Sequence, residues 1–122
     1  MIKYNAFQVS PTELEYYLIR DETLIDVGVG AIMGDEEGTE LPTAYVVLDL
    51  KFSDKESKLK ALNQIHFCLD EQVSGYKRLR GGVWEVTQVP RNATGKVLRK
   101  KFQDFTTGLR SNKTYKKGLP KI

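Results

Sequence analysis

The sequence predicts an α+β fold: a small three-stranded sheet, plus a short N-terminal extended segment, flanked by helices. Apolar residues alternate from Ile25 to Met33, which is typical of a strand with one buried face. Ser10 and Ser53 each precede a Glu by three residues, which is the capping-box pattern of a helix start. With 122 residues, 40% of them hydrophobic, the chain is long enough to bury one core.

The N-terminal part predicts an extended segment followed by a helix. Residues 2–9 carry several bulky β-forming side chains. The helix is expected from residue 11 to about residue 20, with Ser10 as its cap and Glu13 reaching back to complete the capping box. Glu13 and Glu15 are only two positions apart, so on a helix they point in different directions and do not predict a pair of catalytic carboxylates.

Two antiparallel strands are expected next, over residues 24–33 and 43–50. Gly28 and Gly30 alternate on the face opposite the apolar residues of the first strand, which indicates that another element, such as a helix, packs closely against them. The acidic run between the strands, residues 35–40, lacks the Asp/Asn spacing and the final Glu of a calcium loop. It predicts a solvated hairpin connection.

A longer helix is expected from Ser53, because apolar residues then recur every three or four positions as far as Val73. His66 lies beside this stripe, with no second His and no partnered Cys or carboxylate at ligand spacing. We therefore expect a neutral structural histidine and no metal site. Residues 83–89 predict the third strand, and residues 97–105 predict a short helix.

Charge divides the chain into two parts. Residues 1–75 hold 6 Lys/Arg and 14 Asp/Glu (net −8), whereas residues 76–122 hold 13 Lys/Arg and 2 Asp/Glu (net +11), which together give the +3 of the whole chain. The basic part favours phosphate-bearing partners, although charge alone fits a solvated surface better. A single Trp84 among arginines does not favour nucleic-acid binding. No apolar run approaches the roughly 20 residues of a membrane span.

The stretch from Pro90 to Phe102 places Lys96 on an irregular loop directly after Gly95. A lysine beside a glycine on a loop can approach an anionic ligand closely and reach one oxygen with its flexible stem. This stretch is not a P-loop, because a P-loop requires Gly at the position of Pro90 and Ser or Thr at the position of Val97.

Two motifs resemble those of the adenylate-forming enzymes, which include acyl-CoA synthetases, 4-coumarate–CoA ligases, beetle luciferases and peptide-synthetase adenylation domains. The first matches the family's closing Pro-Arg/Lys-x-x-Thr-Gly-Lys element, through Pro90, Arg91, Thr94, Gly95, Lys96, Leu98 and Arg99. The second matches the family's Ile-Lys-x-x-Gly-x-x-Val-x-Pro-x-Glu-Leu-Glu block, over Ile2 to Glu15. The resemblance covers residues 1–105 and rests on two independent motifs in the expected order.

The resemblance implies roles for five residues. Lys96 matches the catalytic lysine that acts in carboxylate adenylation. Lys3 and Gln8, together with Lys96, are implied contacts to the nucleotide or the acyl-adenylate. Asn5 and Ala6 are implied to lie near the pantetheine arm of coenzyme A. Ala6 departs from the family, which usually has Gly there, so its added methyl crowds that channel.

The resemblance also implies the cofactors and partners. ATP/AMP, Mg²⁺ and coenzyme A are expected to bind mainly with a large N-terminal domain, which is the main partner, together with a carboxylic acid substrate. Residues 1–105 are expected to be the mobile C-terminal domain and residues 106–122 a basic, flexible tail. We expect an excised fragment that is inactive alone. The terminal Pro120-Lys121-Ile122 weakly resembles a peroxisomal address, so the expected compartment is cytoplasmic or peroxisomal.

Two alternatives stay open at this point. The first is a subdomain of the peptide-synthetase type, in which a carrier-protein thiol replaces coenzyme A. The second is a stand-alone basic binding or regulatory module without catalysis, which would need neither of the two motifs.

Overall fold

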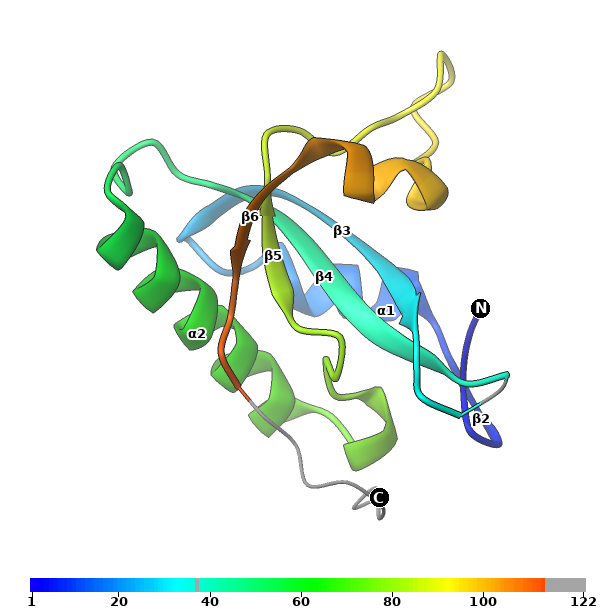
Figure 1. Cartoon of the computed structure of the whole chain (residues 1–122). Coiled ribbons are helices and arrows are strands. Elements are labelled where there is room, and N and C mark those ends of the chain that lie inside the picture. The colour runs from blue at the N-terminus through cyan, green and yellow to red at the C-terminus, as the bar shows by residue number, and fades with distance from the viewer. Residues whose placement is uncertain (37, 114–122) are drawn as a thin grey trace.

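The computed structural model describes residues 1–36 and 38–113. A four-stranded mixed sheet forms its centre, with two α-helices against one face and a 3₁₀-helix against the other (Figure 1). The sheet strands, in spatial order, are β3 (Leu24–Met33), β4 (Glu40–Leu48), β5 (Val83–Val86) and β6 (Thr106–Arg110). The pairing of β4 with β5 is parallel, and the other two pairings are antiparallel.

The remaining elements surround this sheet. They are the strands β1 (Ile2–Tyr4) and β2 (Phe7–Val9), the helices α1 (Pro11–Leu18) and α2 (Lys55–Gln72), and the 3₁₀-helices η1 (Gly75–Lys77) and η2 (Arg99–Phe105). The predicted α+β class is confirmed, but the strand count differs. The expected extended segment is a separate two-stranded hairpin, and β6 adds a fourth strand to the main sheet.

The main core lies between the sheet and the two α-helices. Alternate residues of β3 and β4 point into it and meet the apolar faces of both helices. Its fully buried members, none more than 2% exposed, are Val9, Leu14, Val29, Ala44, Val46, Leu62, Ile65, Leu69, Leu79 and Val83.

The two helix starts differ in detail from the predicted capping boxes. Ser10 caps α1 as expected, because its Oγ accepts a hydrogen bond from the backbone N–H of Glu13 at 3.3 Å. The Glu13 side chain turns away to pair with Lys77 at 2.9 Å. The cap of α2 is Asp54 rather than Ser53, since the Asp54 carboxylate accepts from the backbone N–H of Ser57 at 3.1 Å.

The predicted close packing on Gly28 and Gly30 is confirmed. Both glycines face Phe102 of η2, and a Cβ built on Gly28 would lie 2.4 Å from the nearest ring atom of Phe102. The same ring packs against Tyr45, with ring centroids 4.6 Å apart. The absence of side chains at the two glycines therefore allows η2 to pack closely against β3.

Two expectations for the C-terminal part are corrected. The predicted helix over residues 97–105 is a 3₁₀-helix that begins at Arg99. Thr106–Arg110, which we expected to begin a flexible tail, forms β6 on the sheet edge, and Ser111 is 4% exposed. The strand was not predicted from its own residues because it forms by pairing with β5, which is about 20 positions earlier in the chain. Pro120-Lys121-Ile122 and the rest of the expected tail beyond residue 113 lie outside the described residues.

Candidate functional site

Lys96 lies at the tip of a short, exposed loop that is closed at its base. Arg91 and Val97 form an isolated antiparallel bridge, and the backbone N–H of Leu98 donates to the carbonyl of Pro90 at 2.9 Å. Gly95 has a φ of +88°, in the left-handed region that favours glycine, so it turns the chain directly before the lysine. Within the described residues, the Lys96 ammonium group makes no hydrogen bond or ion pair.

Asn92 organises the interior of this loop. Its side-chain oxygen accepts from the backbone N–H of Thr94 at 3.0 Å, the Thr94 hydroxyl at 2.7 Å and the backbone N–H of Lys96 at 2.9 Å. Its own backbone N–H donates to the Lys96 carbonyl at 2.9 Å, and its carbonyl accepts from Gly95 at 3.0 Å. We singled out Lys96 from the sequence, but we did not identify Asn92.

Arg91 attaches the front of the loop to the start of β3. Its guanidinium makes a two-point contact with Asp26, at 2.7 and 3.0 Å. The Arg91 hydrogen bond holds the pKa of Asp26 below its ordinary value of 3.8, although partial burial acts in the opposite direction. The same pairing raises the pKa of Arg91, so both groups stay charged at neutral pH.

Arg99 attaches the rear of the loop to the middle of β3. Its Nη2 contacts both oxygens of Glu15 at 3.0 and 3.1 Å, and its Nε donates to the carbonyl of Val29 at 2.9 Å. Glu15 in turn accepts from the backbone N–H of Val29 at 2.7 Å. Glu15 therefore holds α1, β3 and η2 together.

The other predicted residues lie on the β1–β2 hairpin. Lys3 and Gln8 are directly opposite in the register and both are exposed, so their side chains share one face. Asn5 and Ala6 form the two-residue turn. Asn5 has a φ of +51°, whereas Ala6 is not among the residues of positive φ, so an alanine fits this turn without backbone strain.

The hairpin is fixed to the connection between β3 and β4. The backbone N–H of Lys3 donates to Glu40 at 2.9 Å, and the Thr39 hydroxyl donates to the side-chain oxygen of Asn5 at 3.2 Å. Both contacts lie at the opposite end of β3 from Asp26, seven residue steps or roughly 23 Å away.

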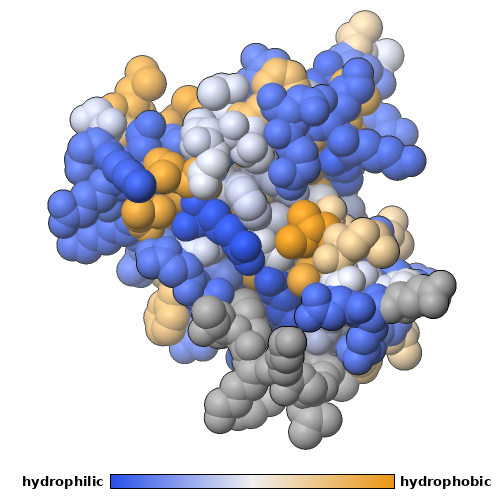
Figure 2. Space-filling view, in the orientation of Figure 1, coloured by the Kyte–Doolittle hydropathy of each residue, from blue (hydrophilic) through white to orange (hydrophobic). Residues whose placement is uncertain are grey.

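The structure thus brings Lys3, Gln8, Asn5 and Ala6 together and leaves Lys96 apart. In Figure 1 the Lys96 loop, in yellow, lies at the upper right and the hairpin, in dark blue, at the lower right. Figure 2 shows a predominantly hydrophilic surface over η2, beside the loop. The domain therefore carries two polar sites at two ends of one strand pair.

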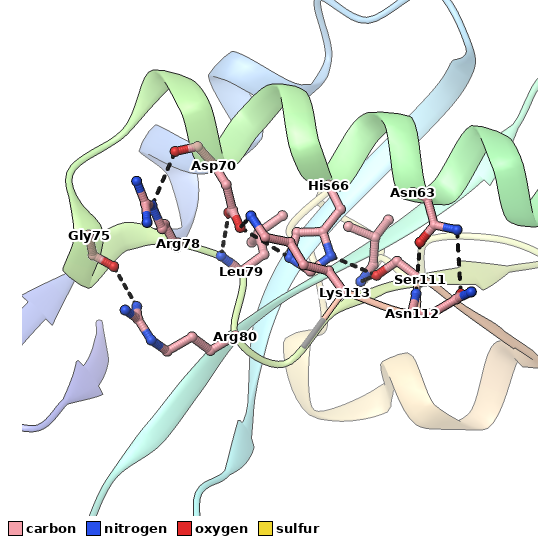
Figure 3. Close-up of polar contacts among 11 residues, drawn as sticks. Asn63, His66, Asp70, Gly75, Arg78, Leu79, Arg80, Ser111, Asn112 and Lys113 are labelled. Atoms are coloured by element: carbon pink, nitrogen blue, oxygen red, sulfur yellow. Dashed lines mark hydrogen bonds and ion pairs between the residues drawn. The ribbon is translucent and has the colours of Figure 1, made fainter. Parts of the chain in front are cut away.

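A second polar cluster, around His66, has the residue types of a nucleophilic triad (Figure 3). His66 Nδ1 lies 2.7 Å from the hydroxyl of Ser111, and Nε2 lies 3.3 Å from the carboxylate of Asp70. Ser111 is only 4% exposed, and His66 and Asp70 are 0% exposed, so no substrate reaches the hydroxyl. The two ring nitrogens are also used in the opposite sense to a serine protease triad. This cluster, which we call the His66 network, is structural.

Asp70 is the member of the His66 network that the sequence prediction missed. It follows His66 by four positions on α2, the spacing at which helical side chains meet. Its carboxylate also accepts from the backbone N–H of Leu79 at 2.9 Å and pairs with Lys113 at 2.7 Å. In the described part of the chain, no group of three or more His, Cys, Asp or Glu could hold a metal ion, and no helix is long and apolar enough to cross a membrane.

Comparison with known proteins places these motifs in context. No family model matches the chain. A putative acyl-coenzyme A synthetase of Emericella nidulans is 39% identical over 105 residues, which are 85% of this chain and 18% of that protein. A luciferin 4-monooxygenase of Photinus pyralis is 38% identical over 105 residues, 86% of this chain and 18% of that protein.

A solved structure shows the same arrangement of elements. An anthranilate CoA ligase in complex with anthranoyl-AMP superposes with a TM-score of 0.69 at 28% identity, over 85% of this chain and 18% of that one. The chain therefore spans about a fifth of the length of the proteins that it matches.

Proposed function

We propose that the chain is the C-terminal lid domain of an adenylate-forming enzyme, an ATP-dependent, AMP-forming acid–thiol ligase, because an acyl-coenzyme A synthetase and a CoA ligase are among the proteins that it resembles. In this role Lys96 enters the active site of a larger N-terminal domain during carboxylate adenylation. The observation that carries the proposal is the loop itself. Its exposed tip presents an ammonium group that pairs with none of the described residues, while its base is fixed to β3 at two points.

The chemistry of the first half-reaction suits such a group. An oxygen of the substrate carboxylate attacks the α-phosphorus of ATP, a new O–P bond forms, and the bond to the β-phosphate oxygen breaks to release pyrophosphate. Negative charge grows on the phosphoryl oxygens while the carboxylate is held in line. An ammonium group at the tip of a fixed loop can orient the carboxylate and stabilise that charge.

The hairpin suits the second half-reaction. After rotation of the domain, Lys3, Gln8, Asn5 and Ala6 would face the site in which a thiol attacks the acyl carbonyl and AMP leaves. The Asp26 contact of the loop and the contacts of the hairpin lie at opposite ends of β3, roughly 23 Å apart along the strand, and this separation supports a rotation. Ala6 fits its turn without backbone strain, so an effect of its methyl on the second half-reaction would come from contact with the thiol substrate.

The residues of the chain account for only part of the cofactor binding. Lys96 fits a phosphate or carboxylate anion, and on the hairpin Lys3 with Gln8 offers donors to an anion after the domain has rotated. ATP, Mg²⁺ and coenzyme A would therefore bind mainly to the N-terminal domain, and the isolated chain would not catalyse. The nature of the acid would be set by the acyl pocket of that domain.

The test is ATP–pyrophosphate exchange by the complete ligase, comparing the wild type with Lys96→Ala. We expect exchange to fall by about 10²–10³-fold, the usual effect of losing one such electrostatic contact. Thioester formation from supplied acyl-AMP should be retained, because that step uses the hairpin.

The matched control is Lys100→Ala, which removes an exposed lysine four positions further on. Its exchange rate should equal that of the wild type. If Lys96→Ala exchanges at the wild-type rate, Lys96 is a surface lysine and the proposed function is wrong.

A further inference from the structure

We infer that Asn92 is the positioning residue of the Lys96 loop: its side-chain amide holds the loop in the shape that presents the lysine. This inference rests on the role proposed for Lys96. Asn92 touches no reacting group, so it would act only through the backbone that carries Lys96.

The hydrogen bonds of the loop converge on this one side chain. Its oxygen receives three donors, two from Thr94 and one from the backbone of Lys96, at distances between 2.7 and 3.0 Å. The third of these bonds ends on the amide of Lys96 itself. In the described part of the chain, no other side chain makes a hydrogen bond to the backbone of residues 93–96, so no other side chain can replace Asn92 in this role.

Besides this side chain, only two backbone hydrogen bonds of Asn92, with Gly95 and Lys96, hold the described loop above its base. Residues 91–96 are all exposed, and a Cβ built on Gly95 would meet nothing within 4 Å. Arg91 and Arg99 fix the base of the loop but do not reach its tip. Without the Asn92 amide, a glycine-containing tip would sample many conformations, and the ammonium group would spend little time in the productive one.

The chemistry also explains why a neutral amide is suited to this position. An aspartate could accept the same three hydrogen bonds, but its charge would lie close to Lys96 and attract the ammonium group away from an anionic substrate. Asn92 supplies the acceptor without that competing charge. Asn92→Asp therefore separates hydrogen bonding from charge, because it keeps the three hydrogen bonds to the loop and adds a negative charge.

The first part of the test measures the loop directly, without catalysis. Backbone ¹⁵N relaxation of the 122-residue chain should give order parameters of about 0.85 at Gly95 and Lys96. In Asn92→Ala the order parameters of these two residues should fall below about 0.6. Asn92→Asp should keep the wild-type order. Gln88→Ala, which removes an exposed amide shortly before the loop, is the matched control and should change neither residue.

The second part measures ATP–pyrophosphate exchange by the complete ligase. Asn92→Ala should lower kcat roughly 10- to 100-fold with little change in KM, as expected of a misplaced catalytic group. The double variant with Lys96→Ala should be no slower than Lys96→Ala alone, because Asn92 acts through Lys96. An equal melting temperature for Asn92→Ala and wild type would exclude general unfolding as the cause.

Two results would overturn the inference. A tip that keeps its order in Asn92→Ala shows that the amide does not hold the loop. A multiplicative loss in the double variant shows that Asn92 acts independently of Lys96. Undiminished exchange in Lys96→Ala alone would instead refute the proposed function, and the relaxation measurement would still decide whether Asn92 orders the loop.

Discussion

The Lys96 loop and the His66 network are both polar, hydrogen-bonded clusters, yet they lie in opposite environments. Asn92 binds its partners on an exposed loop, whereas His66 and Asp70 are 0% exposed. Water can replace any partner lost from the loop, but no water replaces a partner lost from the interior. Similar hydrogen bonds therefore have different effects in the two places: on the exposed loop they position Lys96, and in the core they stabilise the fold.

The same contrast separates the two lysines that the structure places at these sites. Lys113 neutralises a buried carboxylate at 2.7 Å, so its charge is committed to the fold. Lys96 has no such partner among the described residues, so its charge is free for a ligand. Substitutions at the two sites should therefore affect different measurements.

The largest loss of stability should follow Asp70→Ala. This change removes a buried carboxylate that lies beside His66, accepts from the backbone N–H of Leu79 and forms an ion pair with Lys113. Removing one member of a buried pair costs about 3–5 kcal/mol of unfolding free energy. Urea denaturation would measure the loss. Glu71→Ala, which removes the exposed carboxylate next in sequence, should differ from wild type by less than about 0.5 kcal/mol, and equal effects would refute the structural role of the His66 network.

A smaller loss is expected for Gly28→Ala, which tests how η2 is seated. The added methyl would meet the Phe102 ring at 2.4 Å, so the ring must move. Overpacking of this kind costs about 1–3 kcal/mol, measurable by thermal or chemical unfolding. In a Phe102→Leu background the cost should shrink, because a smaller side chain leaves space. An unchanged cost in that background would show that the clash lies elsewhere.

The pH dependence of the Asp26–Arg91 pair should be smaller still. Folding lowers the pKa of Asp26 from 3.8, so the ion pair stabilises the fold at pH values above 3.8 and loses this contribution as the pH falls through the folded pKa. Asp26→Asn should therefore be less stable than wild type at pH 7, by about 0.2–1 kcal/mol because the pair is partly exposed. The difference in unfolding free energy between Asp26→Asn and wild type should close as the pH falls through the folded pKa of Asp26. If the difference in unfolding free energy between Asp26→Asn and wild type did not change with pH, the Asp26–Arg91 ion pair would not be the cause of that difference.

The smallest effect on stability should come from Lys96→Ala. A surface substitution without a structural partner changes the unfolding free energy by less than about 0.5 kcal/mol. The same substitution is expected to abolish most of the exchange activity, so the two measurements together would sharpen the contrast with Asp70. A clear drop in melting temperature would instead assign Lys96 to the fold.

Local patterns allowed much of the fold to be predicted. The strand over residues 24–33 and the cap at Ser10 depend on neighbours in sequence, and both were confirmed. The predicted buried face of the strand was wrong at its two ends, where Ile25 and Met33 are 57% and 69% exposed. The glycine pattern of β3 even predicted the close packing that Phe102 provides. For the strand and the cap, the sequence signal and its physical cause lie within a few residues of each other, whereas the glycines indicated close packing without identifying its distant partner.

Features set by distant partners could not be predicted in this way. β6 forms because Trp84 and Val86 of β5 are available to pair with it, and nothing in its own polar sequence signals a strand. The start of α2 was wrong by one residue because Ser53 and Asp54 are both good caps, and only the folded geometry selects between them. Asn92 gave no signal because any polar residue is ordinary in a loop.

The contacts of Glu15 and Arg99 with Val29 have a consequence for how the domain behaves in solution. β3 is ten residues long and lies at the edge of the sheet, so it is a potential template for strands from other molecules. The two side chains occupy the backbone donor and acceptor of Val29, in the middle of that edge. An incoming strand would have to break an ion pair before it could form a continuous ladder, and this charged interruption protects the domain against edge-to-edge aggregation.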